Sequence, residues 1–286
     1  MSKNPAKPIR PDILERIKKF RLIDDIFMTK CFEGNLECTE LVLRIVMERP
    51  DLVVQSVKVQ SPYKNLQGRS LALDIDATDS TGKRFDIEVQ RADTGASPQR
   101  LRYHASVMDA NALVAGEDFD ALPELYVIFI TEHDVLQGGK PLYHINRHIE
   151  EMNTPFDDGE HFLFVNGEYR DDSPLGRLMQ DFFCTNPDDM HYAPLRERAR
   201  YFKENEKGVT IMSSASEELR EEGRKEGRKE GRKEGRKEGR AEGRAEGRAE
   251  VAKQLLKMGK LSLEEIAKAA SLPLDSVVRL SEMNPA

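Results

Sequence analysis

Two neighbouring segments of alternating apolar and acidic residues constrain the fold of this chain most strongly. Between 71 and 78, Leu, Leu, Ile and Ala alternate with Ala, Asp, Asp and Thr. Between 85 and 90, Phe, Ile and Val alternate with Asp, Glu and Gln. A period of two is typical of β-strands, whose side chains point alternately to opposite faces of a sheet. We therefore expect two strands, over 69–78 and 83–90, that share an apolar face and a carboxylate-rich face.

The turn between these strands predicts which residues lie opposite each other. A three-residue loop, Ser80–Gly82, ends in glycine, which readily adopts the left-handed conformation that such a hairpin needs. With this loop, the opposed residues on the two strands are Ile75 and Ile87, Asp74 and Glu88, and Asp76 and Asp86. The register therefore places carboxylates face to face.

Carboxylates that face each other across a hairpin need a compensating partner. Their Cβ atoms lie only about 4.5–5.5 Å apart, and like charges at that distance destabilise the sheet. A cation, a proton or a basic side chain can compensate, and Mg²⁺ is the simplest candidate because it binds a few carboxylate oxygens and keeps several waters. A metal held in this way can polarise a phosphate and activate a water. The alternative is the solvent-facing side of an edge hairpin, where acidic residues are common.

The remainder of residues 1–212 alternates between helical and strand patterns. The sequence predicts helices over 12–20, 23–33, 39–46, 98–115, 176–183 and 195–207, and further strands over 52–60, 124–131 and 161–166. Thr39 and Ser97 are the expected helix caps, with Pro98 at the first helical position of the second. The continuous apolar run 124–131 is typical of a strand buried on both faces. These elements predict an α/β or α+β domain with a mixed sheet flanked by helices.

Residues 217–250 are a low-complexity linker in which the tetrapeptide EGRK, later EGRA, repeats. Glycine costs about 1 kcal/mol relative to alanine inside a helix. Residues four apart carry like charges, and pairs three apart contribute only about 0.2–0.5 kcal/mol. We therefore expect a frayed helix or a solvated spacer. With 11 basic and 9 acidic residues between 221 and 250, a phosphate-contacting or self-associating arm is the alternative.

Residues 251–286 are predicted to form a short helical appendage. Ser262 and Glu265 form a capping box, Leu272-Pro273 ends that helix, and Asp275 can cap the next. Two short helices around a turn resemble half of a helix-turn-helix. The segment has few basic residues and no evident third helix, which favours a packing or interaction role over DNA reading.

The net charge of −7 demands that any nucleic-acid surface be local, because such surfaces are basic. The first 21 residues carry seven basic residues, and Arg91, Arg100 and Arg102 follow the acidic strands. Solvation alone would explain any one of them equally well. The chain has no run of about 18 apolar residues for a membrane helix, no apolar block of a secretion signal and no Cys pattern of a zinc site. We expect a cytoplasmic protein without a membrane partner.

Several segments resemble the PD-(D/E)XK nuclease family transposases, which are related to recombination-promoting nucleases. The resemblance is carried by LDIDATDSTGKRFDIEVQRAD and RLRYHASVMDANALVAGEDFDALPELYVIFIT. It extends to LIDDIFMTKCFEGN, HFLFVNGEY and SPLGRLMQDFFC, and covers roughly residues 20–215. It implies a restriction-endonuclease-like α/β core followed by a low-complexity and helical C-terminal tail.

The resemblance also implies the site residues. Asp74 matches the first metal-binding acid and Glu88 the second, while Gln90 stands where many of these enzymes carry Lys. Gln offers amide hydrogen bonds but no charge, so the charge falls to a metal or to nearby arginines. An acid on an early helix often completes the metal shell, with Asp25 the first choice and Asp24 the second. The implied cofactor is Mg²⁺, for which Mn²⁺ can substitute.

The implied DNA-binding residues lie just after the acidic strands: Arg91, Arg100, Arg102, Tyr103 and His104. The leading hypothesis is a Mg²⁺-dependent DNA endonuclease linked to transposition or recombination, for which double-strand cutting would favour a homodimer. A non-catalytic DNA-binding or interaction protein on the same fold is the alternative. A third hypothesis places an oligomerisation function in the C-terminal tail.

Overall fold

The computed structural model describes residues 9–65, 68–91 and 95–283, apart from the side chains of Glu222 and Glu226. Lys3 and Lys7, from the predicted basic N-terminus, lie outside these residues. The chain divides into two compact units, which meet between Glu217 and Glu218.

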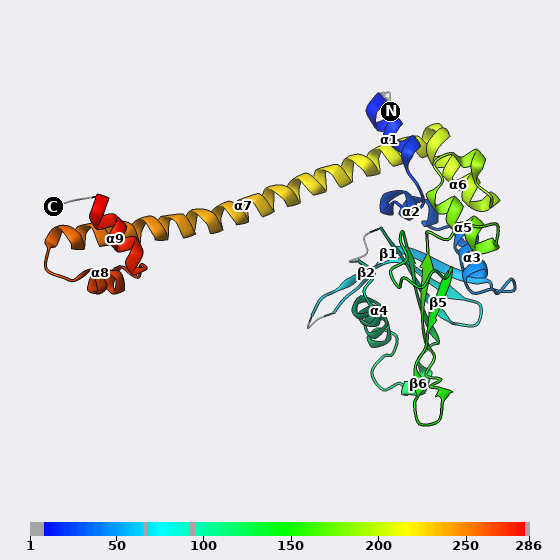
Figure 1. The fold of residues 1–286 in the computed structure, drawn as a ribbon. Helices are drawn as coiled ribbons and strands as arrows, with labels where there is room; N and C mark the ends of the chain where they lie inside the picture. The colour runs from blue at the N-terminus through cyan, green and yellow to red at the C-terminus, as the bar shows by residue number, and fades with distance from the viewer. Residues whose placement is uncertain (1–8, 66–67, 92–94, 284–286) are drawn as a thin grey trace. The chain divides into compact units, whose positions relative to one another are not determined.

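The first unit holds a mixed sheet and the helices that cover it (Figure 1). Its helices are α1 (Pro11–Lys19), α2 (Asp25–Phe32), α3 (Leu36–Val46), α4 (Pro98–Ala110), α5 (Pro174–Phe183), α6 (Ala193–Glu204) and the start of α7 (Glu206–Met258), with 3₁₀ turns at Phe119–Ala121 and Pro187–Asp189. Its strands are β1 (Val54–Tyr63), β2 (Leu71–Asp79), β3 (Arg84–Gln90), β4 (Leu125–Thr131), β5 (Leu142–Ile145), β6 (His148–Ile149), β7 (Thr154–Pro155) and β8 (Glu160–Asn166).

The main sheet has six strands in the order β1-β2-β3-β4-β8-β5. β3, β4 and β8 run parallel to one another, whereas β1 and β2 on one side and β5 on the other are antiparallel to their neighbours. The parallel centre needs crossovers, and α4 lies on the crossover from β3 to β4. This confirms the predicted α/β core with a mixed sheet flanked by helices.

Helices cover both faces of the sheet, and β4 and β8 contribute apolar residues to both sides. α1, α2, α3, α5, α6 and the start of α7 share one core with residues such as Ile75, Ile87 and Ile128. α4 packs on the other face against Leu73, Val127 and other apolar residues. Every residue of β4 except Tyr126 is buried, as the continuous apolar run predicts.

Some predicted boundaries differ from the structure. α3 begins at Leu36 because Asn35, not Thr39, is its cap: the Asn35 Oδ1 atom accepts the Cys38 N–H at 3.0 Å. α4 ends at Ala110 rather than near residue 115. The short strand β5 was not predicted, because four residues are too few to show a period.

The repeat is a continuous part of α7 and not a frayed segment. Every described side chain from 221 to 248 is exposed, so burial of side chains does not explain the helix there. Its Arg, Lys, Glu and Ala residues are good helix formers, and no proline interrupts them. The helix is packed at both ends, since Met212 is buried in the first unit and Ala252 in the second.

The second unit has a small core that joins three helices. Ala252 of α7, Ile266 of α8 (Leu263–Ala270) and Val277 of α9 (Leu274–Met283) are buried together. The predicted capping box is present, with both hydrogen bonds between Ser262 and Glu265. The end of α7 is the third helix that the sequence alone did not reveal.

Among the described residues, no helix combines the length and apolar character that crossing a bilayer requires.

Candidate active site

The β2–β3 hairpin has the register that its turn predicts. Ile75 lies opposite Ile87, and Asp76 lies opposite Asp86. The Asp79 N–H donates to the carbonyl of Lys83 at 3.0 Å, which closes the three-residue loop. Gly82 has φ +87°, a conformation that glycine adopts without steric cost.

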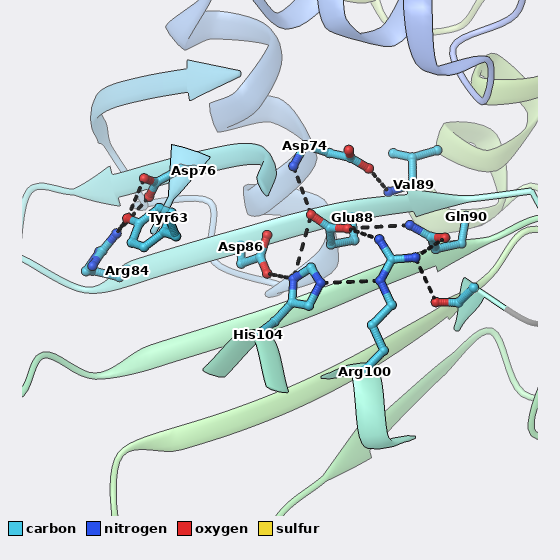
Figure 2. A network of polar contacts seen from close by, with 11 residues as sticks. Tyr63, Asp74, Asp76, Arg84, Asp86, Glu88, Val89, Gln90, Arg100 and His104 are labelled. Atoms are coloured by element: carbon cyan, nitrogen blue, oxygen red, sulfur yellow. Dashed lines mark hydrogen bonds and ion pairs between the residues drawn. The ribbon is translucent and has the colours of Figure 1, made fainter. Parts of the chain in front are cut away.

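Beyond this paired segment, hydrogen bonds to the Asp74 and Glu88 side chains take the place of backbone–backbone hydrogen bonds between the strands. The Asp74 N–H donates to Glu88 Oε1 at 2.8 Å, and the Val89 N–H donates to Asp74 Oδ2 at 3.0 Å. Each carboxylate therefore accepts a backbone N–H from the opposite strand. The two side chains are joined to the same short stretch of the hairpin (Figure 2).

The alternation of β2 breaks at this point. Leu73 packs in the core beneath α4, whereas Ile75 packs in the core on the other face. The expectation of one continuous apolar face on β2 is therefore wrong. On β1, Gln60 has φ +49°, which is uncommon for a residue other than glycine. Both strands are thus distorted next to Asp74.

Glu88 lies at the centre of a buried polar cluster. Its side chain is fully buried, and Arg100 Nη2 contacts Glu88 Oε2 at 3.0 Å. Gln90 Nε2 donates to the same oxygen at 3.4 Å. Burial, and then the charges of Asp86 and Asp74, raise the pKa of Glu88 to about 9. The surroundings of Glu88 therefore favour its neutral form, although the Arg100 guanidinium lies beside it.

His104 connects Asp86 to Arg100. His104 Nδ1 lies 2.8 Å from Asp86 Oδ2, and the Arg100 Nε–H points to His104 Nε2 at 3.3 Å. Because Arg is only a donor, Nε2 must accept, so we assign the proton to Nδ1, which donates to Asp86. Burial lowers the pKa of His104, in agreement with a neutral ring.

Asp86 is fully buried and incompletely satisfied. Of the buried side-chain atoms in the described part of the chain, its Oδ1 and Ser216 Oγ have no hydrogen-bond partner. Burial raises the pKa of Asp86 well above its usual range. Asp86 is predicted from the sequence to lie on the carboxylate face but is not among the predicted site residues. Its position opposite Asp76 was the available signal.

Asp74 is linked to the early helix through Gln60. Gln60 Nε2 lies 3.3 Å from both Asp74 Oδ1 and Asp25 Oδ1, so one amide joins the two carboxylates. Burial raises the pKa of Asp74, and the charge of Asp25 adds to this effect. Asp24 is turned to other partners, since Arg91 Nη1 lies 3.0 Å from its Oδ1. The structure therefore brings Asp25, and not Asp24, to Asp74.

Asp76 belongs to a separate ion pair. Arg84 Nη2 lies 3.0 Å from Asp76 Oδ1, and the Tyr63 hydroxyl donates to Asp76 Oδ2 at 2.8 Å (Figure 2). These partners compensate the Asp76 carboxylate opposite Asp86 without a metal.

The five predicted DNA-binding residues occupy different surroundings. Arg91 is paired with Asp24 and with Glu132, and Arg102 is exposed on α4. The Tyr103 hydroxyl donates to the Arg69 carbonyl, away from Glu88. His104 is fully buried, so direct contact with DNA, as predicted for it, does not agree with this structure. Arg100 alone of the three arginines touches Glu88.

Asp86, Glu88 and His104, together called the acidic cluster, lie close enough to hold a divalent cation. Asp86, Glu88 and His104 each offer a ligand atom, and these atoms all lie within 4.8 Å of one another. The predicted set of Asp74, Glu88 and Asp25 does not form such a group among the described residues. The orphaned Asp86 Oδ1 and the raised pKa values of Asp86 and Glu88 indicate unmet negative charge. Carboxylate oxygens are the donors that Mg²⁺ and Mn²⁺ prefer.

Comparison with known proteins gives one match. No curated protein and no solved structure matches the chain. The family model of the PD-(D/E)XK nuclease family transposases matches residues 46–168, which include Asp74, Glu88, Gln90 and Arg100 but not Asp25. Nucleases of the PD-(D/E)XK type usually use divalent metals, in agreement with the acidic cluster. Over residues 46–168 the resemblance seen in the sequence is confirmed: this segment matches the PD-(D/E)XK nuclease family transposases, which supports a nuclease role.

Proposed function

We propose that this protein is a Mg²⁺-dependent endonuclease that hydrolyses phosphodiester bonds in DNA during transposition or recombination. The observation that carries the proposal is a pair of hydrogen bonds between the two strands. The Glu88 carboxylate accepts the Asp74 N–H, and the Asp74 carboxylate accepts the Val89 N–H. Two acidic side chains are thereby joined at one point of the sheet, inside the segment that matches the nuclease family.

In this proposal Asp74 and Glu88 hold the metal, Asp25 completes its shell, and Mn²⁺ can replace Mg²⁺. His104 lies close enough to Glu88 but is not assigned to the shell, because its Nδ1 donates to Asp86 and its Nε2 accepts from Arg100. When bound, the ion would polarise the scissile phosphate and lower the pKa of a coordinated water. Gln90 keeps its carbonyl toward Arg100 and its amide toward Glu88, so it orients both groups. Asp86 fixes the His104 tautomer, and His104 in turn orients Arg100.

Arg102, which is exposed, and Arg91 are proposed to contact DNA phosphates at the edge of the site. For Arg91 this requires exchange of its ion pairs with Asp24 and Glu132 for a phosphate. Tyr103 would support this surface through its bond to the Arg69 carbonyl. We place the activity in the cytoplasm, where the free cysteines Cys31, Cys38 and Cys184 would stay reduced.

A plasmid-nicking assay tests the proposed activity. Purified protein should nick supercoiled DNA with Mg²⁺ or Mn²⁺ and not with EDTA. Asp74→Asn and Glu88→Gln should each lower the rate at least about 100-fold, because each removes a charged metal ligand. Asp172→Asn removes an exposed carboxylate elsewhere and serves as the control. Absence of nicking with every divalent ion, or equal nicking by Glu88→Gln, would contradict the proposal.

A non-catalytic DNA-binding or interaction protein is the second candidate. The observation in its favour is that the chain supplies its own partners to the acidic residues: Arg100 to Glu88, His104 to Asp86 and Arg84 to Asp76. This candidate expects unchanged DNA affinity in Asp74→Asn and Glu88→Gln and no cleavage by any of the three proteins.

A further inference from the structure

Arg100 makes four polar contacts around Glu88. Its guanidinium lies 3.0 Å from Glu88 Oε2, 2.9 Å from Gln90 Oε1, 3.2 Å from the Gly95 carbonyl and 3.3 Å from His104 Nε2. Two neighbours are neutral side chains and one is a backbone group. Glu88 is therefore the one carboxylate among these four partners of the guanidinium.

The surroundings hold the guanidinium in this position. Ser97 caps α4 by accepting the Arg100 N–H at 3.2 Å, and His104 lies one turn further along the same helix. A Cβ at Gly95 would lie 2.2 Å from Gln90 Oε1, so a larger residue there would require the amide that contacts Arg100 to shift. The ring of Phe129 lies 5.9 Å from the guanidinium carbon.

The Arg100 side chain can nevertheless move away from Glu88. Its exposed fraction is 39%, whereas Glu88 is completely buried. Rotation of Arg100 toward solvent would break polar contacts but would not open the apolar core. Glu88 would then be free to accept another cation.

The position of Arg100 also bears on the uncharged Gln90. Gln90 stands two residues after Glu88 on the same strand, and its Oε1 accepts a hydrogen bond from Arg100. Gln90 thus holds a cation beside Glu88 instead of being one.

We propose that Arg100 supplies the positive charge that pairs with the Glu88 carboxylate in the metal-free protein. It competes with the divalent ion for that carboxylate. Once the ion has displaced it, Arg100 binds the scissile phosphate. The last step rests on the proposed nuclease function, whereas the competition for Glu88 does not.

The competition is tested by calorimetric titration of the full chain with Mn²⁺ alone. Arg100→Gln should bind Mn²⁺ at least about tenfold more tightly than the wild type, because a competing positive charge beside Glu88 is gone. Arg100→Lys should stay close to the wild type. Arg177→Gln removes an exposed arginine of α5 that pairs with Asp172, and it controls for net charge.

A merely structural role for Arg100 predicts the opposite sign. If Arg100 only held the site together, Arg100→Gln would bind Mn²⁺ more weakly or with the wild-type affinity, and either result overturns the inference. If the wild type binds no Mn²⁺, binding gained in Arg100→Gln supports competition, and its absence in both proteins overturns it.

The phosphate role is tested by cleavage under saturating Mn²⁺. Arg100→Gln should cleave at least about 100-fold more slowly despite its tighter metal binding, and Arg100→Lys should restore part of the rate. Cleavage by Arg100→Gln at the wild-type rate would overturn this step. A wild type that binds Mn²⁺ but never cleaves DNA would refute the nuclease function while leaving the Mn²⁺ comparison to decide the competition.

Discussion

The Glu88 carboxylate joins the two strands of the hairpin, but its negative charge is costly to bury when no metal ion is bound. It accepts the Asp74 N–H, which fixes the hairpin, yet it is fully buried beside Asp86 and Asp74. Burying a carboxylate costs free energy unless a cation or proton compensates it. Arg100 contributes a positive charge from one side, but the pKa of Glu88 is still raised to about 9. We therefore expect Glu88 to hold a proton in the metal-free protein and to release it when a metal ion binds.

This raised pKa predicts how the stability of the metal-free protein depends on pH. The folded protein holds a proton on Glu88 up to about pH 9, whereas the unfolded chain releases it near its ordinary value of 4.5. Between these values the folded state binds more protons, so stability falls as the pH rises, at up to about 1.4 kcal/mol per pH unit. Glu88→Gln removes the titration and should lose less stability over this range.

Urea unfolding in EDTA at pH 6 and pH 8.5 measures the difference. The wild type should lose stability relative to Glu88→Gln at the higher pH. A constant difference between the two proteins would show that Glu88 does not titrate in this window.

At the scale of elements, the hairpin β2–β3 was largely predictable and its functional irregularity was not. Alternation and the loop that ends in Gly82 are local properties, and they gave the pairing of Ile75 with Ile87 correctly. The break at Asp74 depends on hydrogen bonds between side chains and the backbone of another strand. Gln60 likewise carries no signal in its own segment, because its partners Asp25 and Asp74 are distant in the sequence.

The same limit applies to α4. The Ser97-Pro98 start is a local signal and predicted the helix that carries Arg100 and His104. Which side of that helix meets the acidic strands depends on how it packs on the sheet. The sequence alone therefore does not distinguish Arg91, Arg100 and Arg102, whereas the structure does.

Gly82→Ala tests the geometry of the loop. The substitution should cost about 1 kcal/mol of unfolding free energy, because alanine is strained at φ +87°. Apart from Gly82 and its two chain neighbours, no described residue has an atom within 4 Å of the added Cβ, so no clash should add to this cost. Urea unfolding gives the stability, and the Mn²⁺ titration serves as the control, since the acidic cluster should be intact. An equal or higher stability would mean that the loop relaxes into another turn.

At the scale of the whole molecule, the site and the tail belong to separate units. The two cores of the first unit contain no residue beyond Met212, whereas the core of the second unit begins at Ala252. The tail is predictable from the sequence but its third helix is not, because the end of α7 is continuous with the repeat. The repeat itself is rich in charged residues, and none of its described side chains between 221 and 248 is buried.

A chain that ends at Glu217 should therefore fold and keep the acidic cluster. Its thermal midpoint should lie within about 4 °C of the first transition of the full chain, which corresponds to about 1 kcal/mol for a domain of this size. Calorimetry measures the midpoint, and the mass in solution of both chains tests whether the tail associates. Loss of cooperative unfolding in the shorter chain would show that the first unit depends on the second.

The position of a bound ion tests the central claim most directly. Anomalous diffraction from crystals soaked in Mn²⁺ would locate the ion and its ligands. We predict one ion with carboxylate oxygens of Asp74 and Glu88 in its shell, at about the 2.1 Å that a small octahedral ion requires, and with Arg100 turned away from Glu88. An ion held by Asp86, Glu88 and His104 without Asp74, or no ion at Glu88 under saturating Mn²⁺, would contradict the account.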